Sequence, residues 1–393
     1  MRVMHFCDHN ATSPLRPECR DAVLHALTIG GNPASVHAAG RAARAIVEEA
    51  RDAVARLAGA KAEDVIFTSG ATESNSLALW GAVEGAMSEG EKPVRITRLF
   101  VSAIEHSSVL KTAQRLCERS PGLRLELIPV TPDGVVDTGA LRALLREGKG
   151  RSLIAVMAAN NETGVIQPIA DISAKARDAG ALLLVDAVPA AGKMDLDFSL
   201  CDYMTLSAHK LGGPQGSGAL VVRQSSDQSA PFAPQLVGGG QQKGLRAGTE
   251  NLSGIAGFGA AARAAWNDKE ERSRVKALRD YFEKNLKAAI PGLVIFGERA
   301  ERLPGTSNVA LPGLSGENIV IALDLDGVLV SSGSSCSSGK ITPSHVLSAM
   351  GVDQALAGAS LRVSFGWNST KEDADAVVTS LLRLNQRAKA RAA

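Results

Sequence analysis

Long apolar runs are missing from this chain of 393 residues. No segment approaches the roughly 18 continuous apolar residues of a membrane span, and the first residues do not combine an apolar core with a cleavage site. We therefore expect neither a membrane-spanning segment nor a secretory signal, and we expect a cytoplasmic location.

Cysteine and excess charge are also scarce. The five cysteines are widely scattered and form no Cys-x-x-Cys pair, which argues against a disulfide framework and against a zinc site. We therefore expect no metal site. A formal net charge of +2 leaves no electrostatic footprint for nucleic acid, so we expect no nucleic-acid partner. The cysteines are Cys7, Cys19, Cys117, Cys201 and Cys336.

What is present is a repeated alternation of short apolar runs with amphipathic helical patterns. Strands that alternate with helices pair in parallel through right-handed crossovers, with helices on both faces of the sheet. The sequence therefore predicts an α/β fold with a mostly parallel sheet. The predicted strands are 65–68, 99–102, 125–129, 153–158, 181–185 and 219–222, and the helices between them are 74–88, 107–120, 137–146 and 169–179.

The chain is too long for one ordinary domain. A mainly helical stretch, residues 252–290, leads into a second group of predicted strands and helices. We predict a large domain over residues 15–258 and a smaller α+β domain over 259–393 together with 1–14.

The polar run Ser207-Ala208-His209-Lys210 lies between an apolar strand-like segment and a glycine-rich loop. A lysine held beside a backbone with few side chains is partly dry, which lowers its pKa and makes the neutral amine a nucleophile toward carbonyls. This points to a Schiff-base lysine at Lys210. The alternative is a surface lysine whose ammonium group reaches water.

Two other strand ends carry polar residues that suit a charged cofactor. At Ser69-Gly70-Ala71-Thr72 a strand meets a helix, so free backbone N–H groups and the helix dipole favour a phosphate; the alternative is that Thr72 only caps the helix. Asp186 ends an apolar run, where its carboxylate would face a protonated pyridine nitrogen or would only cap a turn.

Further candidates follow neighbouring strands. His106 would lie over a ring or move a proton, or would be a structural histidine. Asn161 and Ser207 suit a phenolic oxygen and a phosphate. A phosphate cradle, a ring partner, an imidazole and an amine, all at predicted strand ends, describe a pyridoxal phosphate site.

Two residues in the second half suit a substrate. Cys336 lies in a run of serine and glycine, and an exposed cysteine in a loop is a candidate nucleophile; otherwise it is an unreactive thiol. Arg362 lies on a strand-like segment and would bind a substrate carboxylate, unless it forms a surface ion pair.

The chain resembles the cysteine desulfurases of nitrogen fixation and iron–sulfur assembly, which belong to the class V aminotransferase-like, fold-type I pyridoxal phosphate enzymes. The resemblance covers nearly the whole chain and rests on ordered motifs that include Ser207-Ala208-His209-Lys210. The remaining motifs are 8–12, 31–33, 68–75, 105–109, 160–164, 186–188, 246–251 and 331–336.

This resemblance implies roles for individual residues. Ala71, Thr72, Ser207 and His209 would hold the phosphate, with Thr249 supplied by the partner subunit of a homodimer. Asn161 would face the phenolic oxygen and join Arg362 in binding the substrate, and Lys210 and His106 would move protons. Cys336 would carry a persulfide made from L-cysteine, with alanine as product, for delivery to an acceptor such as an iron–sulfur scaffold, whose iron it could contact.

One position departs from the family. Where its members commonly have a glutamine three residues after the aspartate, this chain has Pro189, which offers no side-chain donor. Because of Pro189, a catalytically impaired scaffold stands as one alternative to desulfuration of cysteine. A selenocysteine lyase or another β-eliminating lyase is the other alternative.

Overall fold

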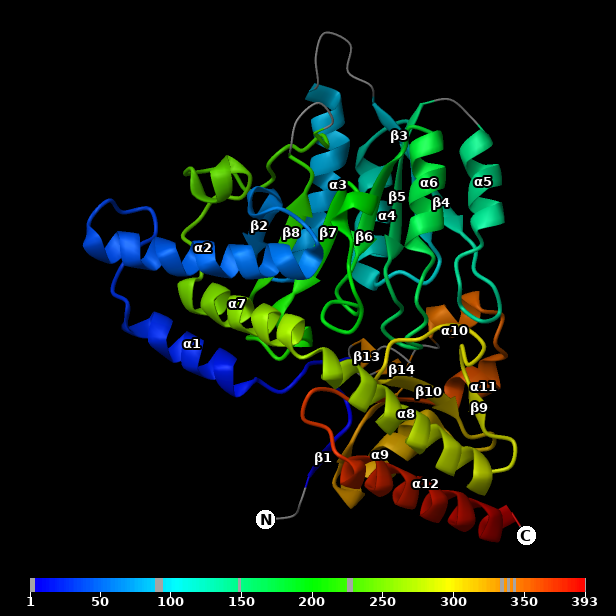
Figure 1. The fold of residues 1–393 in the computed structure, drawn as a ribbon. Coiled ribbons are helices and arrows are strands. Elements are labelled where there is room, and N and C mark those ends of the chain that lie inside the picture. The colour runs from blue at the N-terminus through cyan, green and yellow to red at the C-terminus, as the bar shows by residue number, and fades with distance from the viewer. Residues whose placement is uncertain are drawn as a thin grey trace.

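A computed structural model describes the protein over residues 4–88, 95–147, 150–224, 229–332, 336–337, 340–341 and 344–392. Figure 1 shows a large sheet above and a small sheet below, with α12 (Lys371–Ala392) along the lower side. No helix within those ranges is long and apolar enough to cross a membrane.

The large sheet has seven strands in the order β2-β8-β7-β6-β5-β3-β4. All neighbouring pairs are parallel except the two that involve β8, which runs antiparallel to β2 and β7. The strands are β2 (Val65–Thr68), β3 (Ile96–Ser102), β4 (Arg124–Ile128), β5 (Arg151–Met157), β6 (Leu182–Asp186), β7 (Tyr203–Ser207) and β8 (Gly218–Val222). The predicted mostly parallel α/β sheet is thus confirmed, and β8 is antiparallel because only a short loop separates it from β7.

Helices bury both faces of this sheet. Successive residues of a strand point to opposite faces, and in β6 Leu183 packs into one core while Leu184 packs into the other. One face is covered by α3 (Ala71–Ser88) and α4 (Ser107–Arg119). The other is covered by α2 (Ala38–Ala58), α5 (Thr138–Arg146), α6 (Ile169–Asp178) and α7 (Leu252–Asn267).

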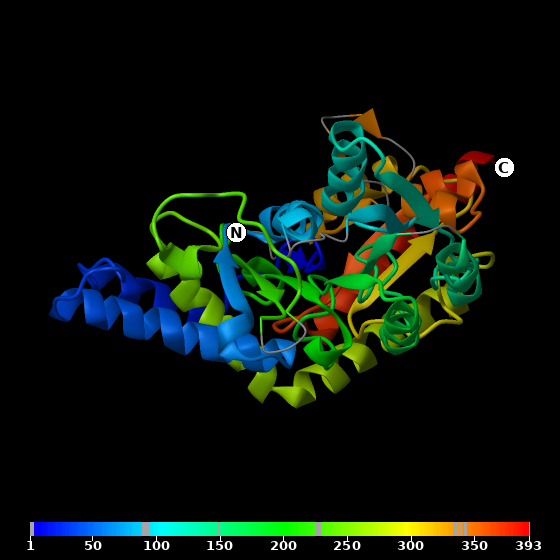
Figure 2. The same cartoon turned by 90° about the horizontal axis from the view of Figure 1, so that it is seen from above.

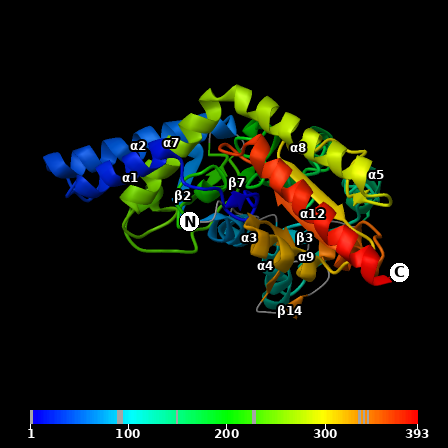
Figure 3. The ribbon, with the colours of Figure 1, turned by 90° about the horizontal axis from the view of Figure 1, so that it is seen from below.

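The small sheet has four strands in the order β12-β15-β10-β9. Its central strands are β10 (Thr306–Ala310) and β15 (Ser360–Ser364), with β9 (Val294–Ile295) and β12 (Ser331–Ser332) at the edges. Helices α8 (Lys269–Ala289), α9 (Gly316–Asp326) and α12 share its apolar core, and Figure 3 shows α8 and α12 side by side below it.

The N-terminal segment joins the small sheet region rather than the large one. Strand β1 (His5–Phe6) pairs in parallel with β11 (Val328–Leu329), and Asp8 forms a parallel bridge with Ser364. From there the chain enters α1 (Pro17–Thr28), and α1 and part of α2 extend beyond the edge of the large sheet, as seen from above in Figure 2. Residues 5–8 therefore belong structurally to the region of the small sheet.

Most predicted elements form within a few residues of their expected bounds. Helix α3 begins at Ala71, three residues before the predicted start, which puts Ala71 and Thr72 in its first turn. The domain bounds 15–258 and 259–393 with 1–14 remain a prediction; the break between them would fall inside α7.

Candidate active site

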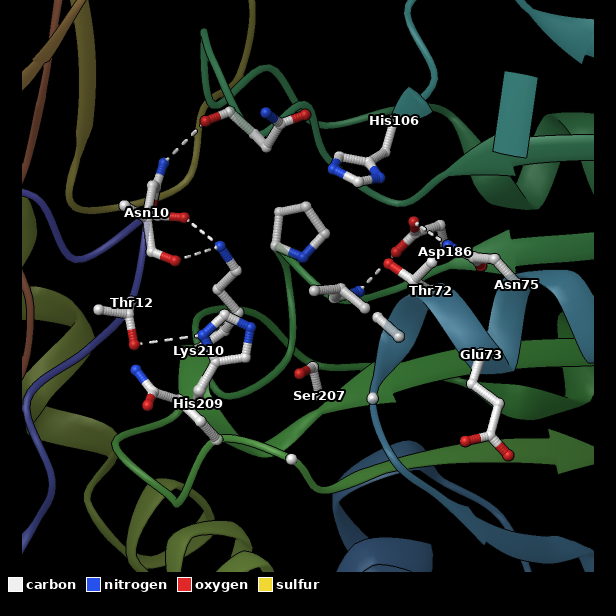
Figure 4. A pocket seen from close by; sticks show the side chains of 18 of the residues that line it. Asn10, Thr12, Thr72, Glu73, Asn75, His106, Asp186, Ser207, His209 and Lys210 are labelled. Atoms are coloured by element: carbon white, nitrogen blue, oxygen red, sulfur yellow. Dashed lines mark hydrogen bonds between the residues drawn. The ribbon is translucent and has the colours of Figure 1, made fainter. Parts of the chain in front are cut away.

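A cavity of about 580 Å³ lies at the carboxyl ends of the parallel strands. Ligands collect at this edge in open α/β sheets because loops and helix N-termini converge there. Nine of the predicted site residues line it, and Figure 4 shows several of them around one space. They are Ala71, Thr72, His106, Asn161, Asp186, Ser207, His209, Lys210 and Arg362.

The turn between β2 and α3 forms an anion cradle. Gly70 has φ +154°, a conformation that favours glycine, and α3 starts at the next residue. A Cβ on Gly218 of β8 would lie 2.7 Å from the Gly70 Cα, so glycine there lets the two backbones meet. Ser69 N donates to the Glu73 carboxylate at 2.8 Å, which leaves the helix start ordered and open to a ligand.

Asp186, the last residue of β6, is buried and accepts two hydrogen bonds. Asn75 Nδ2 donates to one carboxylate oxygen and the Val188 backbone N to the other, each at 3.0 Å. The bond to Val188 is the turn contact considered as the alternative for Asp186. Asp186 also lines the cavity, so its turn contact is compatible with the predicted role of facing a pyridine nitrogen.

His106 caps α4 and its ring is open to the cavity. Ser108 N donates to His106 Nδ1 at 3.1 Å, which fixes the ring. Burial lowers the pKa of His106, Asp186 opposes that change, and Lys210 lowers the pKa further. A neutral imidazole suits both stacking on a ring and proton transfer.

Lys210 follows β7 and its amine is held by the backbone of the N-terminal segment. Lys210 Nζ donates to the carbonyl oxygen of Asn10 and, at 2.8 Å, to that of Ala11. Burial, with Arg362 as the next cause, lowers the pKa of Lys210 to about 8. A half-buried amine with this pKa is unlike the water-exposed surface lysine considered as its alternative.

The residues beside Lys210 are also set into the cavity wall. Ser207 is buried, and His209 Nδ1 lies 3.2 Å from Thr12 Oγ1. Burial lowers the pKa of His209 to about 4, with Lys210 as the next cause. His209 is therefore neutral at pH 7 and would contact a phosphate as a hydrogen-bond donor rather than as a cation.

Arg362, on β15 of the small sheet, reaches the cavity from the opposite side. Its Nη2 donates to Asp8 Oδ1 at 2.9 Å and its Nη1 donates to the Asn161 carbonyl oxygen at 3.3 Å. Both members of the Arg362–Asp8 pair are mostly buried, with side-chain exposures of 11% and 16%. This is a partly buried pair at the cavity rather than a surface one.

Sequence reasoning missed two residues that connect these groups. Asn10 Oδ1 accepts from Lys193 Nζ at 3.0 Å, and Asn10 Nδ2 donates to the Asn161 carbonyl oxygen at 3.1 Å. Lys193 also lines the cavity, and burial, followed by Lys210, lowers its pKa to about 7. Asn10 lies within a motif that carries the family resemblance, whereas nothing in the sequence separates Lys193 from other lysines.

Thr249 and Cys336 are the remaining predicted residues. Thr249 is exposed and lies outside the lining of the cavity. The backbone of Cys336 forms β13 (Cys336–Ser337), which pairs with β14 (Lys340–Ile341), while the Cys336 side chain lies outside the described part of the protein. Across the ranges that the structure describes, no three His, Cys, Asp or Glu side chains are grouped to hold a metal ion.

The donor set fits pyridoxal phosphate. Backbone N–H groups at the start of α3, with Ser207 and His209, suit its phosphate, and Asp186 suits its ring nitrogen. Pro189 lines the cavity without offering a donor, but the Asn161 amide lies on the same cavity and suits the phenolic oxygen.

The chain is similar to curated proteins over nearly its whole length. The chain is 38% identical to cysteine desulfurase IscS of Dictyoglomus turgidum over 383 residues, covering 96% of this chain and 94% of that protein. It is 40% identical to cysteine desulfurase IscS of Anaeromyxobacter sp. over 383 residues, covering 96% and 91%.

The fold has matches among solved structures as well. A NifS-like protein from Rickettsia africae superposes with a TM-score of 0.85 at 31% identity, covering 98% of this chain and 100% of that one. The family model described as aminotransferase class-V matches residues 5–377. This chain therefore belongs to the aminotransferase class-V family.

Proposed function

We infer that this chain is a pyridoxal phosphate-dependent cysteine desulfurase. The observation that carries this inference is the convergence of a low-pKa lysine, a buried aspartate and a partly buried arginine on one cavity. The named relatives, at about 40% identity over most of the chain, favour cysteine as substrate over selenocysteine or another β-eliminated amino acid.

The cavity lining supports the following cofactor contacts. Ala71, Thr72, Ser207 and His209 would hold the phosphate, His106 would stack on the ring, and Asn161 would face the phenolic oxygen. When bound, pyridoxal phosphate withdraws electrons from the substrate's α-carbon. Asp186 would accept a hydrogen bond from the protonated ring nitrogen, because the two donors Asn75 Nδ2 and Val188 N hold its carboxyl group in place at the cavity.

Lys210 supplies the amine that binds the cofactor and then the base that takes the substrate's α-proton. Both tasks need a neutral amine, and its pKa of about 8 keeps a useful fraction neutral near pH 7. His106, open to the cavity and neutral, is the second group able to hold or return a proton.

The substrate carboxylate would bind Arg362 and Asn161. With the substrate held there, the Cys336 thiolate attacks the substrate sulfur and the bond from that sulfur to the β-carbon breaks. The sulfur remains on Cys336 as a persulfide, and the carbon skeleton gains a proton and leaves as alanine. An acceptor protein then takes the sulfur; an iron–sulfur scaffold is the acceptor we propose.

We further propose that the enzyme is a homodimer in which Thr249 completes the partner's phosphate site. Thr249 is exposed and away from its own chain's cavity, as this arrangement requires. The domain division, like the cytoplasmic location expected from the sequence, remains a prediction.

The test is incubation of the cofactor-loaded protein with L-cysteine, measuring alanine and sulfide together and locating the persulfide by mass spectrometry. We expect equimolar alanine and transferred sulfur, with the persulfide on Cys336. Cys336→Ala should keep the visible absorbance of the bound cofactor and lose desulfuration. Full activity of that variant would favour a β-eliminating lyase instead, and a protein that stays colourless when cofactor is added would favour the scaffold alternative raised by Pro189.

A further inference from the structure

We propose that Asp8 is a positioning residue for substrate binding: it fixes the Arg362 guanidinium toward the cavity and connects it to Ser331, next to the segment that carries Cys336. This inference rests on the proposed function, because it assigns Arg362 to the substrate carboxylate. Asp8 itself does not line the cavity, so it acts through Arg362.

The first contact is between Asp8 Oδ1 and Arg362 Nη2, at 2.9 Å. The Asn161 carbonyl oxygen accepts from Nη1 at 3.3 Å, so each terminal nitrogen of the guanidinium has one protein acceptor. Each of those nitrogens carries a second N–H, and among the described residues the buried Nε has no hydrogen-bond partner. The hydrogen bonds to Asp8 and Asn161 thus fix the plane of the guanidinium. The N–H groups of Arg362 that they leave unpaired lie beside the cavity, which Arg362 lines.

The second contact uses the other carboxylate oxygen. Ser331 Oγ donates to Asp8 Oδ2 at 2.7 Å. Ser331 lies directly opposite Arg362 in the antiparallel pairing of β12 with β15, and Asp8 bridges to Ser364 further along β15. One carboxylate therefore joins the proposed substrate arginine to the strand that precedes Cys336 in the chain.

An arginine at this place needs such a partner. Its long side chain loses rotamer entropy when it is fixed, and the hydrogen bond to Asp8 fixes it before the substrate arrives. Two lysines, Lys193 and Lys210, line the same cavity and repel the guanidinium. Without Asp8, we expect Arg362 to turn away from them and to lose its direction toward the substrate.

Asp8 also has an opposing effect, since its negative charge weakens the attraction between Arg362 and a substrate carboxylate. If Asp8 positions Arg362, Asp8→Ala should weaken binding of a substrate carboxylate. If Asp8 only neutralises the charge of Arg362, the same change should strengthen that binding, and Asp8→Asn separates the two effects. The asparagine keeps an oxygen that accepts from Arg362 Nη2 but removes the charge.

The experiment measures binding of two probes to the cofactor-loaded protein through the change in cofactor absorbance. L-alanine carries both an amine and a carboxylate, whereas ethylamine is the same skeleton without the carboxylate. We expect Asp8→Ala to weaken L-alanine binding about tenfold, the usual order for a lost charged hydrogen bond, and to leave ethylamine binding unchanged. Asp8→Asn should restore L-alanine binding to within about threefold of the unaltered protein, because the hydrogen bond remains.

Ser331→Ala tests the second contact. It should leave L-alanine binding unchanged and slow formation of the Cys336 persulfide from L-cysteine about threefold, because the loss of one hydrogen bond loosens that connection. Glu283→Ala is the control, since it breaks a somewhat more buried carboxylate–arginine pair, with Arg302, away from the cavity. It should lower the stability of the protein but should not change the affinity for L-alanine relative to that for ethylamine.

The proposal is overturned if Asp8→Ala and Asp8→Asn both tighten L-alanine binding, which would make Asp8 a counter-charge only. It is equally overturned if Asp8→Ala weakens both probes to the same extent, as a general structural defect would. Should the unaltered protein release no alanine from L-cysteine, the proposed function fails, while the contrast between L-alanine and ethylamine still decides the role of Asp8.

Discussion

The two sides of the cavity are built differently. The side proposed for the cofactor comes from strand ends of one sheet: Gly70 follows β2, Asp186 ends β6 and Ser207 ends β7. The side proposed for the substrate joins Asp8 near the N-terminus to Arg362 on the small sheet, 354 residues away in the chain. The cofactor side is therefore set by the folding of one sheet, whereas the substrate side depends on how the two ends of the chain pack together.

The two sides also differ in charge. On the cofactor side, burial lowers the pKa values of His106 and His209, so neutral imidazoles lie beside the Asp186 carboxyl group. On the substrate side, Arg362 pairs with Asp8, and burial lowers the pKa of Lys193 to about 7. We expect this asymmetry to orient a bound amino acid with its carboxylate toward the small sheet.

The largest expected effect is that of Lys210→Ala, which removes the amine shared by the two sides. Alanine formation from L-cysteine should fall about a thousandfold or more, since a nucleophile and a base are lost together. Absorbance should show no covalently attached cofactor, and mass spectrometry after borohydride reduction should find none. A variant that still releases alanine at the original rate would refute the assignment of Lys210.

Next in size is Arg362→Gln, which alters the substrate side alone. The KM for L-cysteine should rise roughly 30- to 100-fold, because a charged hydrogen-bonding partner of the carboxylate is lost. The affinity for pyridoxal phosphate, measured by titration of the apoprotein, should stay within about twofold if the two sides are independent. A parallel loss of cofactor affinity would contradict the division between them.

Gly218→Ala alters the cofactor side alone and should have a smaller effect. Its Cβ would lie 2.7 Å from the Gly70 Cα, so the turn before α3 must shift and the anion cradle with it. Overpacking of this size costs about 1–2 kcal/mol, which corresponds to a loss of pyridoxal phosphate affinity of about tenfold. KM for L-cysteine at saturating cofactor should be unchanged; a larger rise in KM than in cofactor Kd would reverse the assignment of the two sides.

The smallest expected effect is on pH dependence and links the two sides. Burial lowers the pKa of Lys210 to about 8, so the neutral amine increases with pH and cofactor uptake by the apoprotein should accelerate up to about pH 8 and then level off. Arg362 is the next cause of that lowering, so Arg362→Gln should move the midpoint to higher pH and slow uptake at pH 7 about threefold. If the pH midpoint of the uptake rate, measured by stopped-flow absorbance, is unchanged in Arg362→Gln, then the charge of Arg362 does not affect the pKa of Lys210.

Much of the cofactor side could be predicted because its residues directly follow apolar strands. The alternation of strands and helices predicts a parallel sheet, and a parallel sheet places all of its carboxyl ends at one edge. Asp186 and Lys210 were found in this way. Strand β8 shows the limit, since its direction depends on the short loop before it and not on its apolar residues.

The substrate side could be predicted only in part. Arg362 was identified from its residue type and strand position, but its partner Asp8 and the connection through Asn10 to Lys193 have no local signal. Hydrogen bonds between segments so far apart in sequence depend on packing, which periodicity does not encode.

By itself, the sequence determined the α/β architecture, the strand-end residues of the cavity and the family resemblance, because apolar periodicity and local turn chemistry specify elements and their order. The tertiary structure decided which residues share a charge environment. Burial lowers the pKa of Lys210 to about 8, with Arg362 as the next cause, and both the burial and the nearness of Arg362 arise only in the folded chain. Burial and through-space electrostatics are properties of the folded arrangement, and this is why the asymmetry between the two sides of the cavity appears only there.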